Sequence, residues 1–360
     1  MPTEPILLDS TGKAILAELT NIRNALESAN KPREIYGVTG INNGKTLTRT
    51  DNAVGKSSSD FDHIAPWCDM HEVTDSLGNK FIYIPKFYAK KTLNAWQVSM
   101  TKHDGFTTLF VDGNGKELDY VLVGKYKGSV SDSKLRSVSG VSPAVNATMA
   151  TFRSQAQANG TGYQIEDYLI WNIIQMLFVI EYATVDAQSI VQGYSASGNT
   201  GSHTTGGTNN VTSITGSEDP TSGSYQMKYR GIEDVYGNVW SFCDGVSFSG
   251  ADVYMSIDPT DYGSGKTTGS YSKVGTRATS SGTPQTITPT SKYPLLGYVT
   301  ANGTDNFGDY NWYDAGGQIL LVGGDWNNGS GDGLFALYGD GGASYSNSFI
   351  GSRLCYKPLS

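Results

Sequence analysis

The motif that decides the fold is Gly231-Ile-Glu-Asp-Val-Tyr-Gly-Asn-Val-Trp-Ser-Phe-Cys-Asp-Gly245. At its centre lies the pair Gly237-Asn238, which suits a turn with positive φ because glycine adopts that conformation without steric cost. Trp240 and Phe242 follow at a spacing of two, so that in a strand both side chains point to the same face. We therefore expect a strand that ends in this turn and a second strand that buries Trp240 and Phe242.

The C-terminal stretch from Gly323 to Arg353 has an unusual composition. Between Asp325 and Phe349 it contains no Lys, Glu, Gln, Met or Pro, and it consists largely of Gly, Ser, Asn, Asp, Ala and Tyr. Tyr supplies rigid amphipathic area, while Ser, Gly and Asn supply hydrogen bonds on an adaptable backbone. Two interpretations follow: a surface that makes adaptable contacts with a ligand, or a Gly-rich loop that closes a β domain.

Two helices are expected in the middle of the chain. The first covers 144–158 after Pro143, and the second covers 165–183, where apolar residues form a wide face. The most apolar part of the second helix, 168–183, is interrupted by polar residues and is shorter than the roughly 20 residues that a membrane span needs. We therefore expect a buried helix and no membrane insertion.

The remaining chain is predicted to form short strands and turns. The turn Asp112-Gly-Asn-Gly115 is expected to join the strand-like segments 107–111 and 120–126 in a hairpin. Residues 194–226 and 256–292, which are rich in Gly, Ser and Thr, are expected to be loop insertions. The predicted fold class is therefore α+β with long loops. The other expected strands are 34–38, 46–50, 80–88 and 95–100.

Residues 9–29 are expected to form a helix with a coiled-coil seam, in which Ile15, Leu19, Ile22 and Leu26 recur at alternating spacings of four and three. A lone helix of this length is marginal in water, so the seam needs a partner, either the globular domain or copies of itself. We favour copies of itself, in a homotrimer. The chain then divides into 1–30 for oligomerisation, a small β region at 31–79 and a main domain at 80–360.

Composition excludes several classes of protein. The 360-residue chain has a net charge of −8 and no basic run, so nucleic acid is not an expected partner. The N-terminus lacks the basic region and apolar core of a secretory signal. The cysteines, Cys68, Cys243 and Cys355, are odd in number and widely spaced, so we expect free, buried thiols and not a disulfide framework.

No motif assigns catalytic residues or a cofactor. The four histidines lack metal-ligand spacing, and the chain contains neither His-Glu-x-x-His nor Cys-x-x-Cys. Asp112-Gly-Asn-Gly-Lys-Glu117 is like half a calcium loop, but Lys116 stands where an oxygen ligand belongs, so a plain turn is preferred. A structural calcium ion is compatible with the sequence, but no residue identifies its site.

The motif at 231–245 resembles the Gly-Asn-Val-Trp-Glu-Trp signature of the formylglycine-generating-enzyme branch of the C-type lectin fold. The C-terminal stretch resembles the variable region of proteins that are diversified by retroelements and use the same fold. Weaker likeness to phage tail proteins with this domain extends over 80–192. The C-terminal resemblance is carried by Leu321-Val-Gly-Gly324, Trp326-Asn-Asn-Gly-Ser330, Gly333-Leu-Phe335, Ala343-Ser344 and Ile350-Gly-Ser-Arg-Leu354.

This resemblance implies a C-type lectin domain over 80–360 with a variable region at 323–354. Retroelement diversification changes adenines, mostly in Asn codons, and never produces Lys, Glu, Gln or Met, which are the types that the stretch lacks. The oxidase activity of the enzyme branch needs a cysteine pair or a copper-binding thiol site. Because Cys243 and Cys355 have no neighbouring Cys, we do not expect an enzyme.

The positions between the matching residues are the candidate ligand-binding residues. Tyr338, Tyr345 and Phe349 are the expected anchors, and alternation with serines would place Tyr345, Asn347 and Phe349 on one face of an extended segment. Core packing is the alternative for Leu337 and Phe349. The complete candidate set is Asp325, Gly331, Asp332, Leu337, Tyr338, Asp340, Gly341, Tyr345, Asn347 and Phe349.

The flanking residues are expected to hold this surface in place. Trp326, Phe335, Ile350 and Leu354 are predicted to pack in the core. Arg353 is predicted to fix the chain end by binding backbone carbonyls or a carboxylate, for which its planar guanidinium is suited.

The resemblance implies a receptor-binding protein of a phage or prophage tail, found at the tail tip of the virion or in the host cytoplasm before assembly. Its expected partners are a host-surface protein or glycan, and tail or baseplate proteins. The alternatives are a cell-surface adhesin of the same fold, a formylglycine-generating-type oxidase, and a structural baseplate protein whose C-terminal loop binds nothing.

Overall fold

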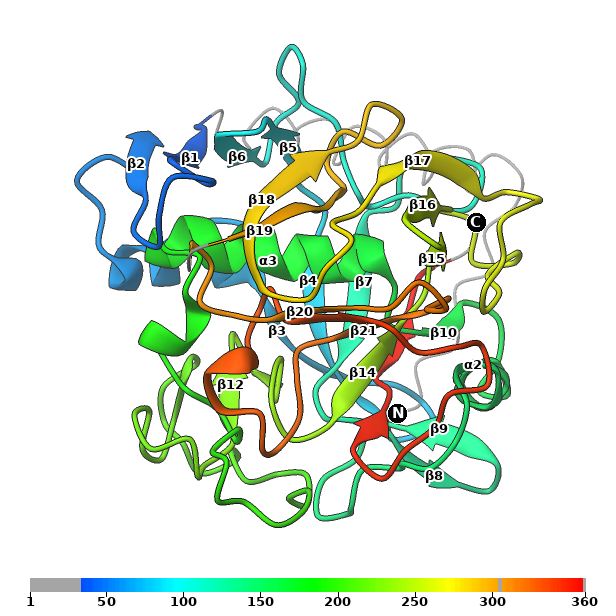
Figure 1. The fold of residues 1–360 in the computed structure, drawn as a ribbon. Helices are drawn as coiled ribbons and strands as arrows, with labels where there is room; N and C mark the ends of the chain where they lie inside the picture. Colours follow the sequence, from blue (N-terminus) through cyan, green and yellow to red (C-terminus); the bar gives the residue numbers. More distant parts are fainter. Residues whose placement is uncertain (1–33, 304–305, 359–360) are drawn as a thin grey trace, which may run out of the picture.

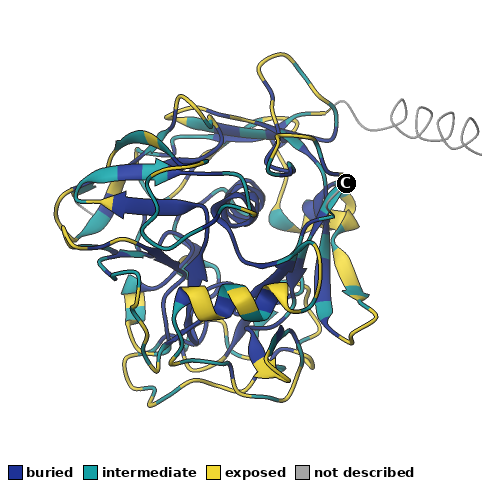
Figure 2. Cartoon of the chain, turned by 90° about the vertical axis from the view of Figure 1, so that its right-hand side faces the viewer, coloured by how far each residue is buried: buried dark blue, intermediate teal, exposed yellow. Residues whose placement is uncertain are grey.

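A computed structural model describes residues 34–303 and 306–358. Its centre is helix α3 (Tyr168–Tyr182), which runs through the molecule between layers of strands (Figure 1). Every residue from Tyr168 to Glu181 is buried, and Figure 2 shows the helix in dark blue, nearly end-on, with strands around it. A helix that is apolar around its whole circumference belongs in a core. The prediction of a buried helix is therefore confirmed.

Buried polar groups fix the start of α3. The Asp167 carboxylate accepts the Ile170 N–H at 3.0 Å and so caps the helix. The same carboxylate forms an ion pair with Lys357 Nζ at 2.5 Å, and both side chains are completely buried. The helix begins after Asp167 and not at Ile165, because Ile165 belongs to strand β10 (Tyr163–Ile165). Among the described residues, no helix is long and apolar enough to cross a membrane.

The helix predicted at 144–158 is shorter than expected. Helix α2 (Met149–Gln157) begins after Thr148, whose hydroxyl accepts the Thr151 N–H at 3.2 Å. Threonine is a favourable capping residue because its oxygen satisfies one of the free N–H groups of the first turn. The helix therefore starts at the Thr148 cap, and the residues from Ala144 to Thr148 precede it as irregular chain.

Two sheets combine strands that lie far apart in the sequence. The strand order of the first is β2 (Thr48–Asp51), β1 (Tyr36–Thr39), β6 (Ala95–Ser99) and β5 (Tyr88–Lys91). The strand order of the second is β10, β24 (Leu354–Tyr356), β7 (Tyr120–Gly124), β4 (Lys80–Pro85) and β3 (His71–Thr74). The C-terminal strand is therefore an inner strand of its sheet.

A third sheet contains strands from both the motif at 231–245 and the C-terminal stretch. Its strand order is β20 (Asn311–Tyr313), β22 (Leu337–Gly339), β21 (Leu320–Val322), β14 (Trp240–Cys243) and β23 (Ile350–Gly351). Gly237 and Asn238 have φ values of 75° and 66°, and a Cβ on Gly237 would lie 2.7 Å from the Tyr194 carbonyl oxygen. Trp240 and Phe242 belong to one buried cluster. The predicted turn and the shared face of these two side chains are confirmed.

The remaining strands form small sheets, and short 3-10 helices lie in the connections. The small sheets contain β11 (Gly216–Ser217), β12 (Met227–Tyr229) and β13 (Ile232–Glu233); β15 (Val246–Ser249), β16 (Asp252–Met255) and β17 (Ser272–Thr276); β18 (Thr283–Pro289) and β19 (Gly297–Gly303); and β8 (Ser129–Ser131) and β9 (Lys134–Arg136). The 3-10 helices are η1 (Ser58–His63), η2 (Trp67–Asp69), η3 (Ala187–Ser189) and η4 (Gly329–Gly331). The fold is thus mixed α and β, with mostly strands and few helices.

The hairpin predicted between 107–111 and 120–126 forms only next to its turn, where Val111 pairs with Glu117 and the Leu118 N–H donates to the Phe110 carbonyl; strand β7 is not part of it. Asp112 does close a turn, since its Oδ1 accepts the N–H groups of Asn114 and Lys116. However, β7 pairs with β4 and β24, while Thr107 pairs with Ala89. Pairing with distant strands outweighs the local turn because it places β7 inside the second sheet.

The predicted division of the chain at residues 30 and 79 stays a prediction. The helix expected at 9–29 lies outside the described residues. Within the described part, β1 pairs with β6 and β3 pairs with β4, so hydrogen bonds cross residue 79. The loop-rich segments 194–226 and 256–292 contain β11, β17 and β18 between long stretches of turns.

Arg353 joins three distant segments of the chain. Its side chain is 1% exposed, and its two terminal nitrogens donate to the backbone oxygens of Gly124 at 2.8 Å, Glu233 at 2.8 Å and Asp234 at 2.6 Å. The planar guanidinium matches this set of carbonyls because its donors lie in one rigid fork. The prediction that Arg353 fixes the chain end through backbone carbonyls is confirmed.

Replacing Arg353 by Lys should lower the free energy of unfolding by roughly 2 to 4 kcal/mol, because a buried charge remains while several carbonyls lose their donors. Urea unfolding measures this change. Arg136→Lys is the matched control, since that guanidinium is only partly buried and binds Asn79 and Leu77. Equal losses in the two variants would contradict a special role for Arg353.

Candidate ligand-binding surface

The two faces of strand β22 differ. The strand runs parallel to β20, with Tyr338 opposite Trp312, and antiparallel to β21. Because side chains alternate along a strand, Leu337 and Gly339 lie on one face and Tyr338 on the other. Leu337 is 7% exposed, whereas Tyr338 is partly exposed.

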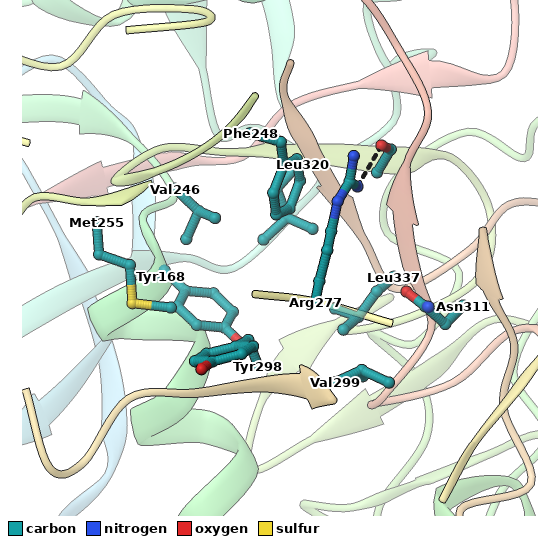
Figure 3. Close-up of a pocket in the computed structure, with 11 residues that line it drawn as sticks. Tyr168, Val246, Phe248, Met255, Arg277, Tyr298, Val299, Asn311, Leu320 and Leu337 are labelled. Carbon is teal, nitrogen blue, oxygen red and sulfur yellow. Dashed lines mark hydrogen bonds between the residues drawn. The ribbon is translucent and has the colours of Figure 1, made fainter. Parts of the chain in front are cut away.

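The face that carries Leu337 and Gly339 is closed (Figure 3). Arg277 donates to the Gly339 carbonyl at 2.5 Å, and its guanidinium lies 3.9 Å from the ring centre of Phe248. Burial lowers the pKa of Arg277 to about 10. The cavity between these residues has a volume of about 30 Å³, which holds a water molecule but no organic ligand. Leu337 therefore packs in the core on this face.

The opposite face carries four partly exposed rings, those of Tyr310, Trp312, Tyr338 and Tyr345, which we call the aromatic strip. Successive ring centres are 4.7 Å, 6.0 Å and 5.7 Å apart in that order. Tyr338 and Tyr345 stack with their planes 2° apart and their hydroxyl oxygens 3.1 Å apart. Beneath the strip lies buried Trp240, whose ring centre is 5.3 Å from that of Trp312. Such packed rings present contact area at little entropic cost.

Asp340 adds a carboxylate at the edge of the aromatic strip. It follows β22 and accepts a hydrogen bond from the Tyr338 hydroxyl. Burial raises the pKa of Asp340, while the hydrogen bond from Tyr338 opposes that effect. The surface therefore offers flat apolar faces together with hydroxyl groups and a hydrogen-bond acceptor, which are groups that can bind a ligand.

The structure separates the ten candidate residues into two groups. Six are partly exposed, and Gly331 lies close to the strip, where a Cβ would be 3.4 Å from the Trp312 ring. The other four are buried and present no side chain to a ligand. The partly exposed group is Gly331, Tyr338, Asp340, Tyr345, Asn347 and Phe349, and the buried group is Asp325, Asp332, Leu337 and Gly341.

Asp325 and Asp332 stabilise the scaffold. Asp332 Oδ1 accepts the Asp325 N–H at 3.1 Å, and Asp325 Oδ1 accepts the Asn327 N–H at 2.9 Å. Burial raises the pKa of Asp325 to about 6, although hydrogen bonds from Asn327 and from the Trp240 indole oppose the change. Burial also raises the pKa of Asp332 well above its usual range. The Asp325 carboxyl is thus bound to the motif at 231–245 through Trp240.

The extended segment predicted for 345–349 is only partly present, because turns precede and interrupt it. Turns lie at 343–344 and 348–349, where the Tyr345 N–H donates to the Gly342 carbonyl and the Ile350 N–H donates to the Asn347 carbonyl. Exposure nevertheless alternates, with Tyr345, Asn347 and Phe349 partly buried and the intervening serines exposed. Tyr345 and Phe349 pack against the buried cluster that contains Trp240, the Asn347 amide oxygen accepts the Ser348 N–H, and the serines are exposed.

The flanking residues confirm most of the predicted core. Phe335, Ile350 and Leu354 are completely buried. The prediction is wrong for Trp326, which is partly exposed. Its backbone carries the anchoring contact, because the Trp326 carbonyl accepts a hydrogen bond from the Asn199 side chain at 2.9 Å and leaves the indole at the surface.

Sequence reasoning missed Tyr310 and Trp312, which lie outside the C-terminal stretch. Their spacing of two, around β20, is the signal that would have placed both rings on one face of a strand. Their position beside Tyr338 depends on the parallel pairing of β20 with β22, which joins residues 26 apart. Local patterns do not reveal such pairing.

The cysteines differ in exposure. Cys243 and Cys355 are buried, and burial raises the pKa of each thiol well above its usual range. Cys68 is exposed, so the prediction of a buried thiol is wrong there; it lies in the 3-10 helix η2. Within the described residues, no group of three or more His, Cys, Asp or Glu side chains is placed to hold a metal ion.

No protein-family model and no curated protein matches the chain. Among solved structures, the chain is similar to two kinds of variable protein. For Treponema denticola variable protein 1, the TM-score is 0.36 at 12% identity, over 80% of this chain and 99% of that chain. For the I1 variant of the Major Tropism Determinant, the TM-score is 0.34 at 14% identity, over 90% of this chain and 72% of that chain.

The stability of the protein should depend on pH through Asp325. Its pKa is about 6 in the folded state against a usual 3.8, so the unfolded chain loses its proton first and stability falls as pH rises from about 4 to about 7. Asp325→Asn should remove roughly 2 to 3 kcal/mol of that fall. Urea unfolding across this pH range tests the effect, with exposed Asp314→Asn as the control; parallel curves for wild type and Asp325→Asn would contradict it.

Buried and partly exposed candidates should tolerate substitution differently. Asp332→Tyr should lower the free energy of unfolding by roughly 3 kcal/mol or more, because a ring has no space at a completely buried position. Asn347→Tyr should change it by less than about 1 kcal/mol. Thermal unfolding of both variants gives the comparison, and equal losses would show that burial does not decide tolerance.

Proposed function

We propose that this chain is a receptor-binding protein with a C-type lectin fold, whose surface within 323–354 is diversified by a retroelement. The observation that carries the proposal is the aromatic strip, in which two candidate variable residues, Tyr338 and Tyr345, stack beside Trp312 at the protein surface. Binding surfaces depend on such anchors, since tyrosine and tryptophan are enriched where binding energy concentrates.

The scaffold supports this role because packed and hydrogen-bonded residues lie behind and beside the partly exposed positions. Behind β22, Arg277 and Phe248 fill the other face. Beside the aromatic strip, Asp325 and Asp332 hold the loop that follows β21. A surface that is ordered before the ligand arrives loses less entropy on binding. Changes at the partly exposed positions would then alter recognition without altering the fold.

We further propose that the protein acts in a phage or prophage tail, at the tail tip of the virion, and that residues 1–30 assemble a homotrimer. A multimer would convert weak single contacts into stable attachment through effective concentration. Its partners would be a host-surface protein or glycan, and tail or baseplate proteins. Light scattering on the full chain and on a chain without residues 1–30 tests the assembly; equal masses would refute it.

Two alternatives use the same scaffold differently. A cell-surface adhesin would keep the binding surface, and immunodetection on intact cells or on virions distinguishes the two locations. A formylglycine-generating-type oxidase would need a reactive thiol, whereas Cys243 and Cys355 are buried, and the pKa values of these two thiols and of the exposed Cys68 are all raised. That chemistry is therefore not favoured.

The diversification proposal is tested on the DNA that encodes the chain. We expect a near-repeat of the sequence for residues 323–354 beside a reverse transcriptase gene, with differences only at adenines. Variable adenines should fall in the codons of partly exposed candidates such as Tyr338, Tyr345 and Asn347. They should be rare in the codons of Asp325 and Asp332, because these residues are buried. A locus without such a repeat would end the proposal.

A further inference from the structure

The aromatic strip lies in the part of the chain that has no basic residue. From Tyr293 to Ser352 the sequence contains no Lys, Arg or His, and its charged side chains are all aspartates. They are Asp305, Asp309, Asp314, Asp325, Asp332 and Asp340. The aromatic strip therefore lies in a segment whose charged side chains are all acidic.

Two of these carboxylates lie at the surface at one end of the aromatic strip. Asp314 directly follows β20 and is exposed, and Asp340 directly follows β22 and is partly exposed. Because Tyr313 pairs with Gly339 in the parallel strands, the next residues of both strands, Asp314 and Asp340, emerge side by side. Two neighbouring carboxylates repel one another, so a cation placed between them would be stabilised by both.

The opposite face of the same strands already holds a cation between rings. The Arg277 guanidinium lies 3.9 Å from the ring centre of Phe248 and 4.6 Å from that of Tyr313. It also donates to the carbonyl oxygen of Asp314 at 2.9 Å. This arrangement, a guanidinium against aromatic faces with oxygen acceptors at its rim, is how a cation is bound by rings.

The aromatic strip has the same components but no cation of its own. In the described part of the chain, no Lys or Arg lies over the rings of Trp312, Tyr338 or Tyr345, whereas such contacts occur at other rings. The donors of Arg277 are used by the carbonyls of Gly250, Gly339 and Asp314 on the other face, and the charge of its guanidinium offsets part of the charge of Asp340 from there.

We propose that the aromatic strip binds a basic segment of a partner protein, with a Lys or Arg side chain against Trp312 and Tyr338 and its charge beside Asp340 and Asp314. This inference rests on the proposed receptor-binding function and names the chemistry of the receptor. Tryptophan is the best aromatic partner for a cation. The acidic surface would also steer a basic partner toward the strip, in a manner that salt weakens.

The inference is tested by titrating the full chain with peptides of equal length that are basic, acidic or uncharged, and with a neutral oligosaccharide. Isothermal calorimetry at low and at high salt measures binding. We expect the basic peptide alone to bind and its affinity to fall as salt rises. Binding of the acidic peptide, or of the neutral oligosaccharide in preference to the basic peptide, would overturn the inference.

Matched variants locate the binding. Trp312→Leu and Asp340→Asn should each weaken binding of the basic peptide by about two- to fivefold. Trp326→Leu and Asp132→Asn are the controls, because Trp326 is a partly exposed tryptophan outside the strip and Asp132 is an exposed aspartate in the β8–β9 turn. Thermal unfolding checks that each variant is folded. If Trp312→Leu does not fold, Asp340→Asn still tests the inference. Equal affinities for wild type, Asp340→Asn and the controls would overturn the inference.

The two proposals can fail separately. If the locus contains a retroelement repeat but the protein shows no preference for the basic peptide, the receptor-binding proposal stands and the inference of a basic partner is refuted. If the basic peptide binds at the aromatic strip but the locus contains no such repeat, the inference of a basic partner stands and the diversification proposal is refuted.

Discussion

The structure depends on the buried guanidinium of Arg353. Arg353 lies between β23 and β24. Its guanidinium donates to the carbonyl of Gly124, at the end of β7, and to the carbonyl of Glu233, in the motif at 231–245. β23 pairs with β14, and β24 lies between β10 and β7. One side chain thus binds the end of β7, in the sheet that contains β24, to β13, in the small sheet of β11, β12 and β13. The turns at 341–349 can follow an irregular path because the strands after them are fixed.

The two faces of β22 have different roles: one packs in the core and the other is partly exposed. The Leu337 side packs against Phe248 and Arg277 around a cavity too small for a ligand, so the strand cannot shift inward. The Tyr338 side is filled only as far as Trp240, and the rings above it remain partly exposed. A binding surface of this kind draws its order from the core beneath it. Its side chains are therefore free to differ in chemistry while the backbone stays in place.

Sequence predicted what depends on local conformation. The Gly237-Asn238 turn, the face of Trp240 and Phe242, and the central helix each follow from a few neighbouring residues, as does the fork of Arg353. The failures concern contacts across the chain. Strand β7 pairs with β4 and β24 and not across the nearby turn, where Val111 pairs with Glu117. Tyr310 and Trp312 join the surface through parallel pairing. Asp325 and Asp332 have the residue type of a surface loop, yet backbone N–H groups make their burial possible.

The stacking of Tyr338 on Tyr345 has a consequence for any set of related chains. Two rings that share a face and a hydroxyl contact are energetically coupled, so the effects of changing them are not additive. A new residue at one position changes which residues fit at the other. The sequences that such a surface can sample are therefore correlated pairs, and its usable repertoire is smaller than the product of the choices at each position.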